Sequence, residues 1–136
     1  MQNPPPVQIA KSSTGLEENL AALLSYVFGW VSGLIFFLIE KDSRLVRFHA
    51  MQSLLLNVVA GVVAIALWIV LFVLFMIATQ VSGALTTLLG FVSILIWLVF
   101  IAAIVIGVVM CLIKAYQGQY FKLPIIGNFA EKFSAK

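Results

Sequence analysis

The sequence predicts an all-α fold: an integral membrane bundle of three transmembrane helices with a short amphipathic C-terminal segment. Three apolar runs contain no charged residue, namely Leu20–Ile39, Leu54–Ile77 and Leu88–Ile113. Each run has the ~20 residues that a helix needs to cross a hydrocarbon core of ~30 Å. Of the 136 residues, 63% are hydrophobic and only 10% are charged, whereas about 25% of the residues in a soluble domain are charged. The composition therefore favours lipid over water as the solvent of this chain.

The segment before the first apolar run is polar, and we expect residues 1–13 to form a disordered tail. Its three consecutive prolines favour an extended polyproline conformation. Residues 14–136 are expected to form a single three-helix domain. The first helix should span about residues 15–40, because Thr14 and Glu17 have the spacing of a capping box.

The second and third helices are predicted from the other two apolar runs. The second should span about residues 45–78, which is longer than the hydrocarbon core requires, so its first polar turns should lie in the headgroup region. An uncharged loop with a turn at Gly83 should lead to a third helix over about residues 86–116. Gly118 follows this helix and is expected to stop it.

The C-terminal tail, residues 120–136, has the pattern of a short amphipathic segment. Phe129 and Phe133 fall opposite the charged residues Glu131 and Lys132. This spacing predicts an interfacial segment that rests on the membrane surface.

The distribution of Lys and Arg predicts the orientation of the three spans. The N-terminal tail and the loop at Gly83 would share one side of the membrane, which carries only Lys11. The other side would carry seven basic residues: Lys41, Arg44, Arg47, Lys114, Lys122, Lys132 and Lys136. The positive-inside rule then places the N-terminus outside and the C-terminus in the cytoplasm, with Lys41, Arg44 and Arg47 as topology determinants. We expect a multi-pass protein of a prokaryotic plasma membrane.

Polar side chains form one stripe at the start of the second predicted helix. His49, Ser53 and Asn57 recur every four residues, and Gln52 lies beside them. In lipid such a stripe turns toward other helices, because an unsatisfied polar group is costly in hydrocarbon. We expect the stripe to supply interhelical hydrogen bonds. The alternative is one wall of a polar cavity for a substrate or a peptide.

The first predicted helix carries two glycines four residues apart, Gly29 and Gly33. Such a pair permits close approach between helix backbones. The glycines and the polar stripe are therefore the candidate helix-packing or partner-contact residues.

No combination of residues predicts catalysis or metal binding. The three apolar runs hold no Asp, Glu, Lys or Arg that would extend a proton pathway from His49. The single histidine and the single cysteine, Cys111, lack the spacing of metal ligands. Cys111 is expected to pack as a small apolar residue, because an apolar setting disfavours the thiolate. We expect no enzymatic activity and no cofactor.

The formal net charge of +3 raises the question of an acidic partner. The basic residues lie at helix ends and in the tail, where anionic lipid headgroups attract them. The expected partners are therefore membrane lipids and other membrane proteins or further copies of this chain, and not nucleic acid.

Two groups of residues carry a resemblance to a known family. They are Glu18-Asn19, Leu24-Ser25-Tyr26, Gly33, Arg47-Phe48-His49-Ala50 and Gln52-Ser53 in the first half, and Tyr120, Leu123-Pro124, Gly127 and Glu131-Lys132 in the tail. Over about Thr14–Lys132 the chain resembles a family of small prokaryotic membrane proteins. That family is considered a distant relative of the twenty-kilodalton channel-like subunit of the chloroplast inner-envelope import translocon. The plant subunit has four spans, one more than we predict here.

Two functions fit the sequence. The first is a non-enzymatic interaction or assembly subunit of the membrane, for which the resemblance implies a link to protein translocation. The second is a channel or small transporter subunit. That function needs an oligomer to line a path, because three spans without intramembrane charge offer no ion path of their own.

Overall fold

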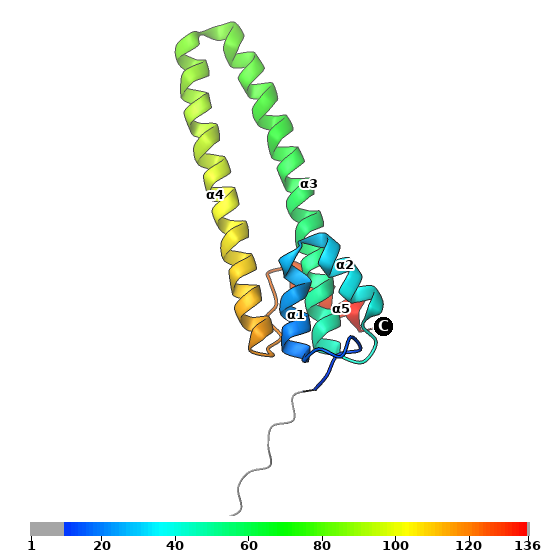
Figure 1. Ribbon diagram of the computed structural model, residues 1–136. Helices are drawn as coiled ribbons and strands as arrows, with labels where there is room; N and C mark the ends of the chain where they lie inside the picture. The colour runs from blue at the N-terminus through cyan, green and yellow to red at the C-terminus, as the bar shows by residue number, and fades with distance from the viewer. Residues whose placement is uncertain (1–9, 136) are drawn as a thin grey trace, which may run out of the picture. The chain divides into compact units, whose positions relative to one another are not determined.

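The computed structural model describes residues 10–135, and within them the chain forms five helices. These are α1 (Glu18–Val27), α2 (Trp30–Ile39), α3 (Arg44–Val81), α4 (Gly83–Tyr116) and α5 (Ile126–Ser134) (Figure 1). The predicted all-α class is therefore confirmed for this part of the chain. The chain divides into two compact units, so that α3 and α4 each contribute to both. Of the described residues, unit 1 comprises 10–56 and 110–135, and unit 2 comprises 57–109.

The first apolar run is not one helix. The predicted helix over residues 15–40 is wrong, because the chain turns between α1 and α2 at Gly29, which has a φ of +61°. Glycine adopts this left-handed conformation readily because it lacks a Cβ atom. The Oγ of Ser32 accepts a hydrogen bond from the N–H of Phe28 at 3.1 Å and donates one to the carbonyl of Ser25 at 3.0 Å. These bonds pair backbone groups that the interrupted helix leaves open.

The two short helices form an antiparallel hairpin whose open ends meet at the start of α3. The Oγ of Ser43 donates to the carboxylate of Glu18 at 2.8 Å, and the N–H of Ser43 donates to the carboxylate of Glu40 at 2.9 Å. The beginning of α1 and the end of α2 thus lie at one level (Figure 1). Each helix has 10 residues, or about 15 Å at 1.5 Å per residue, which is half of a hydrocarbon core.

The hairpin overturns the predicted separation of the N-terminal segment from the connector before α3. Three spans would place Ser13 and Lys41 on opposite sides of a membrane, but the N–H of Lys41 donates a hydrogen bond to the Oγ of Ser13 at 2.9 Å. The predicted disorder is also wrong for residues 10–13, which the structure describes as ordered. Residues 1–9 lie outside the described part, whereas Lys11 pairs with Glu17 in an isolated bridge. Helix α1 begins at Glu18 and takes no side-chain cap from Thr14.

Two helices in the described part are long and apolar enough to cross a membrane, α3 and α4. They have 38 and 34 residues, or about 57 and 51 Å at 1.5 Å per residue. Because the first apolar run is broken, the structure does not support the predicted third span. Only Ser82 separates α3 from α4, so the loop predicted between residues 78 and 86 is helical on both sides of that serine.

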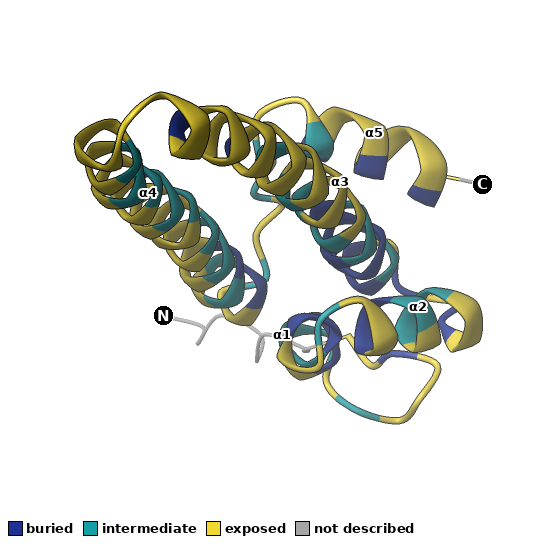
Figure 2. Ribbon diagram, turned by 90° about the horizontal axis from the view of Figure 1, so that it is seen from above, coloured by how far each residue is buried: buried dark blue, intermediate teal, exposed yellow. Residues whose placement is uncertain are grey.

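The core of unit 1 is built from small side chains. Ala21 and Ala22 of α1 pack against Cys111 and Ala115 of α4, and Val46 of α3 completes the group. All five are fully buried, because residues of this size let the helices approach closely. A second cluster joins Phe48 and Met51 of α3 to Ala130 of α5. Figure 2 shows that the buried residues of α3 gather in its first turns.

In unit 2 most of the large apolar residues are exposed, and the ribbon of this unit is mostly in the colour of exposed residues (Figure 2). Val62 of α3 is 63% exposed and Val99 of α4 is 71% exposed. Water would oppose so much contiguous apolar surface. Lipid or other apolar helices are the surroundings that suit this unit.

The tail is folded and contains the short helix α5. Helix α4 ends where Gly118 takes a φ of +71°, and the N–H of Gln119 donates to the carbonyl of Lys114 at 2.9 Å. This is the pattern of a Schellman turn, which pairs the last carbonyls of a helix. Further on, a Cβ atom added at Gly127 would lie 2.6 Å from the Cα of Lys122, so only glycine fits there.

Candidate functional site

A buried polar cluster lies in unit 1 between α1, α3, α4 and the segment after α4. We define the polar cluster as the side chains of Tyr26, His49, Gln52 and Cys111 together with the backbone of residues 119–123. Its His49 and Gln52 are the predicted candidates, and both are fully buried. The chain's own tail segment fills the space beside the stripe.

His49 connects α1 to the tail segment. Its Nε2 lies 2.8 Å from the carbonyl oxygen of Gln119, and its Nδ1 lies 2.8 Å from the hydroxyl of Tyr26. A carbonyl only accepts hydrogen bonds, so Nε2 carries the proton and Nδ1 accepts a hydrogen bond from Tyr26. A histidine held in this way acts as a bridge between segments.

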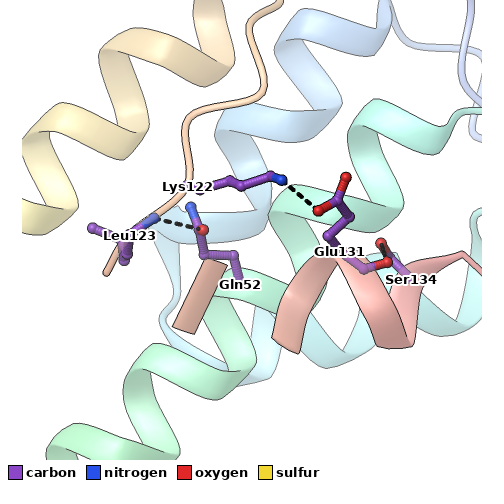
Figure 3. A network of polar contacts seen from close by, with 5 residues as sticks. All are labelled: Gln52, Lys122, Leu123, Glu131 and Ser134. Atoms are coloured by element: carbon purple, nitrogen blue, oxygen red, sulfur yellow. Dashed lines mark hydrogen bonds and ion pairs between the residues drawn. The ribbon is translucent and has the colours of Figure 1, made fainter. Parts of the chain in front are cut away.

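Gln52 binds the tail backbone with both ends of its amide. Its Nε2 donates to the carbonyl of Phe121 at 2.8 Å, and its Oε1 accepts from the N–H of Leu123 at 3.1 Å (Figure 3). The same Nε2 lies 3.1 Å from the hydroxyl of Tyr26 and 3.4 Å from the Sγ of Cys111. The side chain therefore binds the tail backbone on both sides of Lys122, through the carbonyl before it and the N–H after it.

The two candidate glycines lie against α3. A Cβ atom added at Gly33 would lie 2.9 Å from the carbonyl oxygen of Ala50 and 3.1 Å from the N–H of Leu54. The Oγ of Ser53 donates to the carbonyl of Gly29 at 3.2 Å. Helix α2 thus touches α3 backbone to backbone. Asn57, one turn beyond Ser53, is half-buried and is the first residue of unit 2.

A second polar group surrounds the carboxylate of Glu40, which is fully buried. Its Oε1 accepts from the N–H of Ser13 at 3.0 Å, from the N–H of Asp42 at 2.9 Å and from the N–H of Ser43 at 2.9 Å. Burial raises the pKa of Glu40, but these hydrogen bonds outweigh it, and the net pKa lies below its ordinary value. The carboxylate joins the N-terminal segment, α2 and α3.

The three predicted topology determinants lie at the start of α3. Lys41 and Arg44 are exposed. Arg47 is half-buried: its Nη1 donates to the carbonyl of Glu40 at 2.9 Å, its Nε donates to the carbonyl of Ser134 at 3.3 Å, and its guanidinium lies 4.8 Å from the ring centre of Phe37. Arg47 therefore also connects α2 and α5 to α3.

The polar side chains of these groups are paired within the protein. Among residues 10–135, every buried side-chain nitrogen or oxygen has a hydrogen-bond partner. In the same part of the chain, no group of three or more His, Cys, Asp or Glu side chains is placed to hold a metal ion. Such fully paired networks stabilise one arrangement of segments.

Sequence reasoning missed several members of these groups. The sequence offers Tyr26 only as part of the family resemblance, and it predicts position 40 only as the end of a helix. The signal for Glu40 was its position, a carboxylate placed directly before the start of α3, where helix N–H groups are unpaired. The hydrogen bonds that residues 119–123 make to His49 and Gln52 involve backbone atoms, so side-chain identity does not predict these bonds directly.

Comparison with known proteins assigns a family. Residues 14–130 match the magnetosome magnetite crystal formation protein family. A UPF0132 membrane protein of Methanocaldococcus jannaschii is 36% identical over 126 residues, which cover 93% of this chain and 96% of the relative. A UPF0132 membrane protein of Archaeoglobus fulgidus is 35% identical over 117 residues, which cover 86% and 95%. No solved structure matches the chain significantly.

These relatives do not support the relationship to the chloroplast import translocon that the resemblance suggested. They do support the other half of that resemblance, a family of small prokaryotic membrane proteins. The motif residues of that resemblance contribute to the geometry described above, since Gln52 bonds Leu123 and Gly33 contacts Ala50. With residues 14–130 matched, the chain belongs to the magnetosome magnetite crystal formation protein family, whose relatives here include the archaeal UPF0132 membrane proteins.

Proposed function

We propose that the protein is a non-enzymatic assembly subunit of a prokaryotic membrane. In this proposal α3 and α4 cross the bilayer as a helical hairpin and associate there with other membrane proteins or with further copies of the chain. Unit 1 forms a folded, charged platform on one membrane face.

The distribution of charge carries the proposal. The chain has eight Lys and Arg and five Asp and Glu, and none of them falls within residues 57–109, the range of unit 2. A charged side chain is expensive in hydrocarbon, so the uncharged and exposed unit 2 suits the bilayer and unit 1 suits its surface.

The same distribution assigns a side of the membrane in this proposal. Because α1 and α2 form a hairpin that returns to its starting level, the N-terminal segment joins the connector at Lys41 and the tail on one side. All eight Lys and Arg then lie on that side, and the uncharged turn at Ser82 lies on the other. The positive-inside rule places such a platform, with both chain termini, in the cytoplasm.

Association in the membrane is supported by the surface of unit 2. Two helices that leave most of their large apolar side chains exposed present broad faces for van der Waals packing, which drives helix association in lipid. The family is described by its role in magnetite crystal formation in magnetosomes. From this description we take over only the membrane location, and we propose that the chain assembles there with other proteins or with copies of itself.

Photo-crosslinking in native membranes tests this proposal. A photoreactive residue replaces Val62 or Val99, which are exposed in unit 2, and Lys41 serves as the matched exposed position in unit 1. The expected result is a discrete protein adduct, with this chain or another, from at least one unit 2 position. Lipid adducts alone from both positions, together with a monomeric mass in mild detergent, would contradict the proposal.

The alternative function is an oligomeric channel or small transporter subunit. It predicts selective flux when purified protein is reconstituted in liposomes. The polar cluster argues against a path through a single copy, because its side chains are paired with one another and with the tail. We do not extend the proposal to protein translocation, since that link rested on the relationship to the chloroplast subunit.

A further inference from the structure

Helix α5 presents three separate rows of side chains. One row, Gly127, Ala130 and Ser134, is buried against unit 1. A second row is apolar and exposed, and it consists of Ile125, Phe129 and Phe133. The third row is polar and exposed: Asn128, Glu131 and Lys132. A helix that only packed on its own protein would need the first row alone, so the apolar row requires another explanation.

The apolar row is built as a continuous surface. The rings of Phe129 and Phe133 stack with their centres 6.3 Å apart and an angle of 16° between their planes. Ile125, at the start of the helix, is 72% exposed and holds a φ of +66°, which is unusual for a branched residue. These side chains form one ridge that the described chain leaves uncovered.

The attachment of α5 fixes the level of this ridge. Ala130 packs on Phe48 and Met51 in the first turns of α3, and Ser134 accepts a hydrogen bond from Arg47. Lys122 forms an ion pair with Glu131, which holds the polar row beside the tail (Figure 3). The ridge therefore lies at the start of α3, where the basic residues Arg44 and Arg47 precede its apolar stretch.

We infer that the ridge of Ile125, Phe129 and Phe133 inserts into the boundary between headgroups and acyl chains of an anionic lipid bilayer. An amphipathic helix lies in this boundary with its apolar side buried and its cations toward the headgroups. Lys132 follows Phe129 by three residues and therefore lies beside the ridge, not opposite it as the spacing in the tail predicted. Lys132 and Arg44, both exposed, are the cations that attract anionic headgroups. The tail thus anchors unit 1 to the membrane surface.

This inference rests on the proposed function, and the experiment separates the two. Single nitroxide labels are attached to cysteines that replace Phe129, Phe133 or Asn128 in the full chain. Val62 of α3 serves as the reference within the proposed span. Cys111 is fully buried, and the unsubstituted chain serves as the labelling blank. The collision rates of each label are measured with oxygen, which concentrates in lipid, and with a water-soluble nickel complex. The vesicles consist of phosphatidylcholine alone or mixed with phosphatidylglycerol.

Positions 129, 133 and 62 should be severalfold more accessible to oxygen than to nickel, whereas position 128 should show the reverse. Phosphatidylglycerol should move the labels at positions 129 and 133 deeper into the bilayer, and Lys132→Gln should reduce this effect. Equal thermal unfolding of the labelled chains checks that they fold.

If the labels at positions 129 and 133 are as accessible to nickel as the label at position 128, while the label at position 62 remains in lipid, the inference is overturned and the proposed function stands. Spin–spin broadening at 129 or 133 would assign the ridge to a second copy and would also overturn it. If position 62 is accessible to nickel, the proposed function fails as well.

Discussion

The side chain of Gln52 and the backbone of Leu123 are joined by a hydrogen bond of 3.1 Å across 71 positions of sequence. Gln52 belongs to the His49-Ala50-x-Gln52-Ser53 pattern of α3, and Leu123 begins the Leu123-Pro124-x-x-Gly127 pattern of the tail. The two patterns are therefore two sides of one contact. Gln52 recognises a peptide backbone, and the proline and glycine that follow give that backbone its course.

Replacing Gln52 by alanine should destabilise unit 1 and release the tail. The carbonyl of Phe121 and the N–H of Leu123 would lose their buried partner, at about 1–3 kcal/mol for each unpaired group. Thermal unfolding in lipid nanodiscs and the rate of proteolysis after residue 119 measure the two effects. Gln80→Ala is the matched control, because Gln80 lies on the same helix and is exposed, and it should change stability by less than about 0.5 kcal/mol. Equal behaviour of the two variants would contradict this account of the tail.

A methyl group at Gly33 should loosen α2 from α3. Gly33→Ala would place a Cβ atom 2.9 Å from the carbonyl oxygen of Ala50, and relief by backbone movement costs about 1–3 kcal/mol. Gly61→Ala is the control, since a Cβ atom there meets nothing within 4 Å and alanine favours a helix. Unfolding midpoints should fall for the first variant and stay or rise for the second. The opposite order would show that α2 does not contact α3 in this way.

Gly127→Ala should detach α5 while leaving the rest of unit 1 folded. The added Cβ atom would lie 2.5 Å from the Cβ of Lys122 and 2.6 Å from its Cα, so the tail backbone must move, at about 1–3 kcal/mol. Amide hydrogen exchange should accelerate over residues 126–134 and remain slow over α1. Gly90→Ala, with open space around its Cβ position, should leave both unchanged. Protection of α5 in the Gly127 variant would disprove the tight approach.

The stability of unit 1 should depend on pH through Glu40. The pKa of this carboxylate is lowered from its ordinary value of 4.5, so its ionised form stabilises the folded state. That contribution is present above pH 4.5 and is lost as the pH falls through the lower pKa of the folded state. Unfolding midpoints should therefore drop steeply below pH 4.5, and Glu40→Gln should flatten this dependence.

Glu17→Gln is the control for that titration, because Glu17 pairs with Lys11 through its backbone and lies outside the Glu40 network. It should keep the acid dependence of the unsubstituted chain. The same slope in the Glu40 variant would show that another group controls acid unfolding.

Much of the helical content follows from hydrophobic patterning, but the break at Gly29 does not. Apolar runs without charge predicted helices near the observed positions of α3 and α4, since hydrocarbon leaves the backbone few other options. Gly29 stands four residues before Gly33, and this spacing equally fits a continuous packing helix or a turn. The contacts that decide between them come from Ser53 and Ala50 of α3, which is a tertiary effect.

The candidate site was predictable in part for the same reason. The polar stripe of His49, Gln52 and Ser53 was visible because polar residues are rare in apolar sequence. Its partners were not visible, since His49 and Gln52 bind backbone groups of Gln119 and Phe121. The predicted membrane orientation was affected most by the break in the first apolar run. The number of basic residues on each side of the membrane depends on whether that run crosses it.

Labelling of single cysteines in cells with a membrane-impermeant maleimide tests the central claim, that two helices cross the membrane and both ends of the chain share one side. Cysteines replace Ala10, Ser82 or Lys132, and the unsubstituted chain with its buried Cys111 is the blank. We predict that the cysteine at position 82 is labelled in intact cells, whereas the cysteines at positions 10 and 132 are labelled only after permeabilisation. Labelling of Ala10 in intact cells with protection of Lys132 would restore three spans and contradict the account.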